Sequence, residues 1–365
     1  MQIVYTKRNG ESWDISALVD TAAWSGDYKQ AARTLRVTLA FRQGTDYPQA
    51  LIEGMDNGEV LRLIDGGEAL FSGYIFVITG KLGETSRELM AYDGAVYLTK
   101  SAVSHNFIGA SAQTITRTVA TGLGVQVGHM PSDGGLAISF THIGGTAYAA
   151  IIGAWTKVSK VSGAKYFLRM DGWQLTVRWM GDKVAAFLID PSLNLVSGEA
   201  SRSIEEAVTR AIVNNAEGAI LGVAANDTNV TNYGVLQAVE ANEEGVDPQG
   251  QAQGMLKDED NQITLPDIIG GPGSNDLVTG HAVGVRVAGL GLTGRFFIIN
   301  DEHTWQGGVH KVSLGLSYDA LMDEEELQDL QDAQEAAATG AATSRPGTAP
   351  ADGNPWATAE EIGKR

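Results

Sequence analysis

Short runs of alternating apolar and polar residues, separated by glycine-containing turns, constrain the fold of this chain most. Residues 35–41 read Leu-Arg-Val-Thr-Leu-Ala-Phe, so alternate side chains point inward on a half-buried strand. Two further apolar runs, 60–64 and 69–78, are joined by Asp65-Gly66-Gly67, whose glycines can take the positive φ of a hairpin turn. The chain has 45 glycines without a fixed period. Many lie between such runs, which predicts many short strands.

The middle of the chain has a different pattern. Ser111 precedes a stretch with helical apolar spacing over 112–120, and a second such stretch begins at Tyr148, which predicts two helices. A hairpin follows, with strands over 166–170 and 173–179 around a turn at Asp171-Gly172. Two helices and a hairpin predict a small α+β domain.

The third part of the chain returns to β patterns. Ser203 and Glu206 have capping-box spacing, which predicts a short helix start. Asp247-Pro248 predicts an N-cap followed by a first-turn proline, with a helix running to about Asp260. Three alternating strands are then expected. They cover 280–287, 294–300 and 309–317, and the last two meet across Gln306-Gly307-Gly308.

These patterns predict a mostly β chain with an α+β insertion. We expect a first β section over 1–99, an inserted α+β domain over 100–195, a second β section with short helices over 196–320, and an acidic helical and flexible tail over 321–365. The tail begins with an acidic run and continues with Ala, Gly, Thr and Pro, a composition typical of linkers. Trp356 in this tail is either an exposed remnant or an anchor for a partner.

Charge and composition exclude several functions. The net charge is −18, which disfavours binding to nucleic acid and to anionic lipid. Cysteine is absent, so disulfides and thiolate metal sites are excluded, as suits a protein folded in a reducing cytoplasm. Residues 1–10 lack the apolar core of a signal peptide, and no apolar stretch is long enough to span a bilayer. We expect a soluble protein without membrane insertion.

No catalytic motif stands out. Gly289, Gly291 and Gly294 match a dinucleotide fingerprint, but a strand pattern follows where a helix is required, so a turn is expected. The six histidines lack metal-site spacing, although His303 and His310 could meet across a hairpin. No catalytic residue, cofactor or metal is therefore predicted.

The remaining acidic and aromatic candidates are assigned structural roles. We expect Asp65 and Asp301-Glu302 to be solvated turn residues. Among the tryptophans, Trp155 and Trp179 are expected in the core, and Trp13 and Trp24 are expected to be partly exposed.

Several phrases, taken in order, resemble the baseplate hub family of contractile-tailed phages and phage-derived bacteriocins. They include residues 203–206, 231–237, 273–277, 294–304 and 308–314, with 70–74 and 91–93 in the first part. The resemblance covers most of 1–318. Its motif residues here are Tyr233, Gly234, Asn275, Asp276, Gly280, Asp301, His303, Gly308 and His310.

The resemblance implies a fold and a function. Family members look like two β-barrel domains with insertions, related to the barrels of type VI secretion spike proteins. The resemblance therefore implies that 1–99 forms a first β-barrel domain and 196–320 a second. They form a homotrimer that joins the six-fold tail tube protein to the three-fold central spike protein, among other baseplate proteins. The resemblance thus implies a structural, non-enzymatic subunit of the virion tail baseplate or of a bacteriocin (tailocin) particle, made in the host bacterial cytoplasm.

Two other functions remain open from the residues alone. A tail-associated cell-wall hydrolase would need a convergent carboxylate pair or a metal site. A carbohydrate-binding module would use exposed aromatic side chains such as Trp13, Trp24 and Trp173. Both alternatives predict a monomer that works alone.

Overall fold

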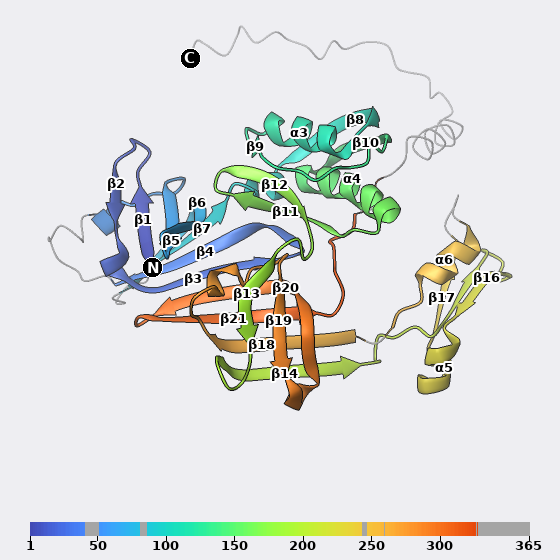
Figure 1. Ribbon diagram of the computed structural model, residues 1–365. Helices are drawn as coiled ribbons and strands as arrows, with labels where there is room; N and C mark the ends of the chain where they lie inside the picture. Colours follow the sequence, from blue (N-terminus) through green and yellow to red (C-terminus); the bar gives the residue numbers. More distant parts are fainter. Residues whose placement is uncertain (41–50, 81–85, 243–246, 259, 326, 328–365) are drawn as a thin grey trace, which may run out of the picture.

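The computed structural model describes residues 1–40, 51–80, 86–242, 247–258, 260–325 and 327. Its central feature is a sheet of thirteen strands that combines the first and third parts of the chain. The main path of this sheet runs β14-β18-β21-β20-β3-β4-β7-β6-β5-β1-β2. The inserted α+β part lies on one side of it, and a small separate sheet extends from the end of β14 and β18 (Figure 1). The predicted mostly β fold with an α+β insertion is confirmed.

The first β section has its own apolar core, built from alternating inward side chains such as Leu35, Val37 and Leu39. The predicted hairpin is confirmed, with Gly66 and Gly67 at φ +58° and +85°. The strand predicted over 35–41 is β4, and its last expected residue, Phe41, lies outside the described residues. The strands are β1 (Gln2–Thr6), β2 (Ser12–Asp14), β3 (Val19–Asp27), β4 (Gln30–Ala40), β5 (Val60–Asp65), β6 (Glu68–Gly80) and β7 (Ser86–Asp93).

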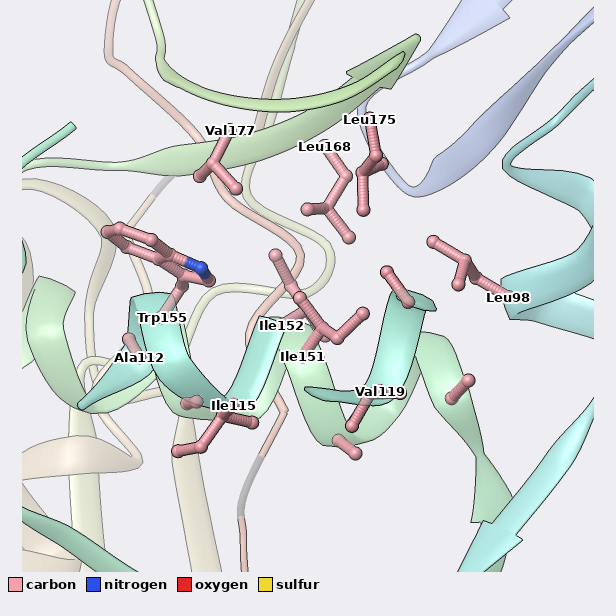
Figure 2. Close-up of a cluster of buried hydrophobic side chains, with 14 of the residues drawn as sticks. Leu98, Ala112, Ile115, Val119, Ile151, Ile152, Trp155, Leu168, Leu175 and Val177 are labelled. Atoms are coloured by element: carbon pink, nitrogen blue, oxygen red, sulfur yellow. The ribbon is translucent and has the colours of Figure 1, made fainter. Parts of the chain in front are cut away.

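The insert packs two helices against a β-hairpin. Ser111 caps α3 by accepting from the Thr114 amide, and Thr146 caps α4 by accepting from the Ala149 amide. Figure 2 shows Ile115 and Trp155 of these helices in one apolar cluster with strand residues such as Val177. Both predicted helices and the predicted hairpin are confirmed. The elements are α2 (Val96–Lys100), β8 (Ala102–Ala110), α3 (Ala112–Gly122), β9 (Gln126–Val127), β10 (Ile138–Thr146), α4 (Ala147–Ser162), β11 (Tyr166–Asp171) and β12 (Gln174–Trp179).

The second β section has a separate apolar core that includes Leu265, Phe296 and Leu314. Its strands are β13 (Val184–Ile189), β14 (Leu195–Ser203), β18 (Asp260–Ile269), β19 (Ala282–Val287), β20 (Leu292–Gln306) and β21 (Val309–Ser317). β13 pairs in parallel with β19 and so belongs to the main sheet. β20 pairs antiparallel with β3, and this pairing joins the two β sections.

A small sheet interrupts the second β section between β14 and β18. It has the strand order β16-β15-β17, and α6 packs on it through Ala252. Its elements are β15 (Arg210–Asn214), β16 (Ile220–Ala225), α5 (Asp227–Tyr233), β17 (Gln237–Ala241) and α6 (Pro248–Gly254). We call residues 204–258 the small domain.

Two helix predictions in this region need correction. No helix begins at Ser203, because its hydroxyl accepts from the amide of Glu205 in a turn and the chain then enters β15. Such local side-chain bonds compete with helix formation. Asp247 does cap a helix, α6, by accepting from the Gly250 amide. This helix ends at Gly254 rather than near Asp260, as its glycine content favours.

Two tryptophans also differ from expectation. Trp24 is only 1% exposed because it lies on the inward face of β3 opposite Leu35. Trp179 is 47% exposed, since it is the last residue of β12 and extends beyond the core that covers Leu175 and Val177. Trp155, in contrast, is fully buried as predicted.

The start of the acidic tail packs on the insert. The buried side chain of Met322 belongs to the insert core, and Leu327 packs beside Gly153 of α4. Residues 321–325 and 327 contain no helix. The rest of the predicted acidic helix and linker, with Trp356, lies outside the described residues.

Candidate functional site

The junction between the two β sections holds a buried ion pair. Arg33 lies on β4 of the first section, and Asp301 lies on β20 of the second. Arg33 donates from both terminal nitrogens to the Asp301 carboxylate, one of these bonds measuring 2.9 Å. The two side chains are 8% and 0% exposed. The expectation that Asp301 is a solvated turn residue is therefore wrong.

Neighbouring groups stabilise the charges of this pair. Asp301 also accepts from the amide and hydroxyl of Thr279 at 2.7 and 2.6 Å. Burial alone would raise the pKa of Asp301, but the charge and hydrogen bonds of Arg33 lower it overall. The Arg33 guanidinium lies 4.0 Å from the centre of the Trp24 ring, a cation–π distance. A buried pair with this many partners is expensive to break.

A second acid contacts Arg33 through the backbone. Asp93, at the end of β7, accepts from the backbone amides of Arg33 and Ala95. Burial raises the pKa of Asp93 to about 7, although these two amide bonds and the Arg33 charge act against the increase. The carboxyl of Asp93 thus fixes the start of α2 to β4.

Two histidines lie beside the ion pair in a single hydrogen-bonded chain. His303 Nε2 lies 2.9 Å from the Leu277 carbonyl. A carbonyl only accepts, so this nitrogen donates and the other ring nitrogen, Nδ1, accepts from His310 Nε2 at 3.0 Å. His310 stacks on Trp305 with ring centroids 4.4 Å apart. The predicted approach of His303 and His310 across the hairpin is confirmed.

Both histidines are held neutral. Burial lowers the pKa of His303 even though Asp301 is near, and burial together with His303 lowers the pKa of His310 to about 4. The Ser274 hydroxyl lies 3.3 Å from His310 Nδ1, which brings a serine and a histidine together. Ser274 is only 1% exposed, and its hydroxyl donates to the Gly271 carbonyl. The contact between Ser274 and His310 is therefore interpreted as packing inside the protein.

The remaining predicted motif residues fall into two groups. Asn275 donates to Asp65 at 3.1 Å and so connects the second β section to the first, whereas Asp276 pairs at 2.6 Å with Lys183, which directly precedes β13 of the same section. Gly280 has φ +92°, and a Cβ at this position would overlap the Phe167 ring. Of the other motif residues, Tyr233 is the last residue of α5 in the small domain, Gly234 is the C-cap of that helix, and Gly308 is in the β20–β21 turn.

Sequence reasoning did not single out Arg33, Thr279 or Arg169. A signal for Arg33 was present, since it shares the inward register of Leu35, Val37 and Leu39 on β4. A charged residue in that register indicates a buried partner. Arg169 donates to His281 at 3.1 Å, and no local pattern marks this contact.

In the described ranges no three His, Cys, Asp or Glu side chains gather closely enough to hold a metal ion. None of the described helices is both long and apolar enough to cross a membrane. At the junction, the charges of Arg33 and Asp301 neutralise each other inside the protein, where they hold the two β sections together.

The sequence of this chain is similar to those of known proteins. Residues 22–317 match the model of a family described as YQBQ-like. The chain is 22% identical over 306 residues to the phage-like element PBSX protein XkdQ of Bacillus subtilis (strain 168), covering 82% of this chain and 92% of that protein.

Solved structures share the fold. The 43 kDa tail protein of prophage MuSo2 from Shewanella oneidensis superimposes with a TM-score of 0.65 at 16% identity, over 87% of this chain and 98% of that one. A tail protein from Neisseria meningitidis MC58 gives 0.62 at 15% identity, over 87% and 97%. These findings confirm the resemblance predicted from the sequence. The chain belongs to the YQBQ-like family and has the fold of prophage tail proteins.

Proposed function

We propose that this protein is a structural subunit of a phage-type tail and forms the baseplate hub of a contractile tail. Three copies would form a ring that joins the six-fold tail tube to the three-fold central spike. The family match and the shared fold with two tail proteins, one of them from a prophage, support a structural role in a tail. The trimer, the contractile tail and the position in the baseplate are our inference.

One observation carries this proposal. The two β sections have separate cores, yet they share one sheet through β3 and β20 and a buried ion pair across the junction. Each subunit therefore contains two β sections, which strand pairing and the buried ion pair hold together. Three such subunits supply six β units around a ring, which would match a six-fold tube on one side and a three-fold spike on the other.

The experiment combines particle imaging with solution mass. Deletion of the gene is expected to abolish assembled baseplates in negative-stain images, and expression of the gene in trans should restore them. Analytical ultracentrifugation of the purified chain, alone and with tail tube and spike proteins, should show trimers. Normal baseplates in the deletion strain would refute the proposal. Cleavage of peptidoglycan by the purified chain would instead favour a hydrolase.

A further inference from the structure

A cavity of about 280 Å³ lies between the first β section and the insert. Its walls include Tyr74 of β6, Tyr97 of α2 and Trp173 of the turn between β11 and β12. Tyr74 contacts Trp173 and Tyr97 with ring centroids 5.2 and 5.8 Å apart and planes at 52° and 67°. Met170 and Gln126 also line this cavity, which we call the aromatic pocket.

The lining of the aromatic pocket favours an uncharged aromatic ligand. None of the described residues that line it is charged, so an ion bound there would lose its water without gaining an opposite charge. The tilted rings enclose a guest on several sides and can accept a further aromatic ring by edge-to-face contact. The Met170 thioether also packs favourably on aromatic rings. An aromatic side chain therefore fits the chemistry of this cavity.

The described part of the chain ends on the same insert. Met322 is buried in the insert core, and the Tyr148 hydroxyl donates to Asp323 at 2.8 Å. Leu327 packs beside Gly153 of α4. The chain after Leu327 therefore continues from the insert rather than from the end of β21.

The sequence after Leu327 contains one residue that matches the aromatic pocket. Trp356 is the only aromatic residue between 328 and 365. It lies in an uncharged stretch, 353–359, and follows Pro355, whose ring fixes its backbone φ and so reduces the entropy lost on binding. Ile362 is the only other large apolar residue after 330. Composition therefore selects Trp356 as the group that would enter the pocket.

The length of chain between Leu327 and Trp356 permits this contact. A linker of 28 residues, the length of 328–355, has an r.m.s. end-to-end distance of roughly 30 Å. A domain of the size of the insert is also roughly 30 Å across. When these lengths match, the effective concentration of the tethered group is greatest and lies in the millimolar range. A dissociation constant of about 1 mM for the free segment would therefore be enough to fill the pocket in a large share of the molecules.

We infer that Trp356, together with Pro355, occupies the aromatic pocket of its own chain. The contact brings the end of the chain back onto the insert and covers the ring of Tyr97, which is 38% exposed among the described residues. The inference does not depend on the proposed ring, because every group in it belongs to one subunit. Trp356 of another copy could fill the same pocket, and the first experiment separates the two cases.

The first experiment uses the absence of cysteine in the chain. Gln126→Cys places a thiol at the rim of the pocket, because Gln126 is exposed, and Ala357→Cys places one next to Trp356. A short bismaleimide should link these two thiols within one chain at least about tenfold faster than it links Ile143→Cys with Ala357→Cys. Ile143 is the matched control, because it is 80% exposed on β10 of the same insert.

Substitutions in the tail then test the role of the indole. Trp356→Ala, added to the pair at 126 and 357, should lower the crosslinking rate to that of the control pair, whereas Ile362→Ala should leave it unchanged. Equal rates for the two cysteine pairs, or a rate that Trp356→Ala does not lower, overturn the inference. Covalent dimers in place of internally linked monomers also overturn it, because they assign the pocket to Trp356 of another copy.

A second experiment needs no cysteine. Labelling with fluorotryptophan gives a fluorine NMR resonance for each of the seven tryptophans, and Trp356→Phe identifies the resonance of Trp356. In the wild-type chain this resonance should be shifted from that of free fluorotryptophan, and Tyr97→Ala, which removes one wall of the pocket, should return it to the free position. Trp179→Phe, a change at a residue 47% exposed at the end of β12, should not move it. A wild-type resonance at the free position would overturn the inference.

Discussion

Arg33 and Asp301 are separated by 268 positions in the chain, yet they form a buried ion pair within one sheet. The pair lies where β3 and β20 bring the two β sections together. Changes to this ion pair or to its neighbours should therefore alter the stability of the contact between the two sections.

Breaking this pair should destabilise the protein strongly. Arg33→Met leaves Asp301 buried without its partner, and we expect a loss of about 3–5 kcal/mol in the free energy of unfolding. Arg36→Met on the same strand is the matched control, because Arg36 pairs with Glu88 at the surface and such pairs contribute at most about 1 kcal/mol. Urea unfolding followed by circular dichroism measures both. Equal losses in the two variants would show that the buried pair is not a main support of the junction.

Gly280→Ala tests the close approach of the second β section to the insert. Gly280 and Gly10 have nearly the same φ, +92° and +90°, but only Gly280 has the Phe167 ring beside it. Gly10→Ala should cost about 1–2 kcal/mol from the left-handed backbone alone. Gly280→Ala should cost about 1–3 kcal/mol more, from overpacking. Thermal unfolding of the two variants compares these costs, and identical melting temperatures would contradict the predicted overlap.

Acid should weaken the junction through its histidines. Burial, with Arg169 nearby, lowers the pKa of His281 from 6.5 to about 4, and burial with His303 does the same for His310. The stability from each histidine is complete above pH 6.5 and is lost as the pH falls to about 4. Asp93 acts in the opposite direction, since burial raises its pKa from 3.8 to about 7 and its contribution is lost as the pH rises through that range.

Two variants separate these contributions. His310→Gln should flatten the dependence of unfolding free energy on pH between 6.5 and 4, by up to about 1.4 kcal/mol per pH unit. Asp93→Asn should make it steeper, because the opposing group is gone. Chemical unfolding at half-unit pH steps measures both slopes. Wild-type slopes in both variants would mean that neither group titrates with folding.

Gly153→Ala should release the start of the acidic tail from α4. A Cβ at Gly153 would overlap the Leu327 side chain, whereas a Cβ at Gly122 of α3 meets nothing within 4 Å. Both changes favour the helix by up to about 1 kcal/mol, so Gly122→Ala is the matched control. Limited proteolysis should cut within residues 318–327 faster in Gly153→Ala only. Equal cleavage rates would show that Leu327 does not hold this segment.

Local patterns in the chain predict its elements well, because the features that specify them act over a few residues. Alternation over 35–41, the turn at Gly66-Gly67, the cap at Ser111 and the hairpin that brings His303 to His310 all depend on near neighbours. The helix expected at Ser203 failed where a local turn competed with it.

Local patterns did not predict which distant residues meet. The inward register of β4 places Arg33 in the core, but only the pairing of β3 with β20 brings Asp301 to it. In the same way, Asn275 reaches Asp65 and Gly280 reaches Phe167 across sections of the chain. Strand pairing between distant segments depends on the summed burial of whole faces rather than on any short motif. The sequence predicts that Asp301 is a solvated turn residue. Asp301 is instead buried at the centre of the junction, because the tertiary structure pairs β3 with β20.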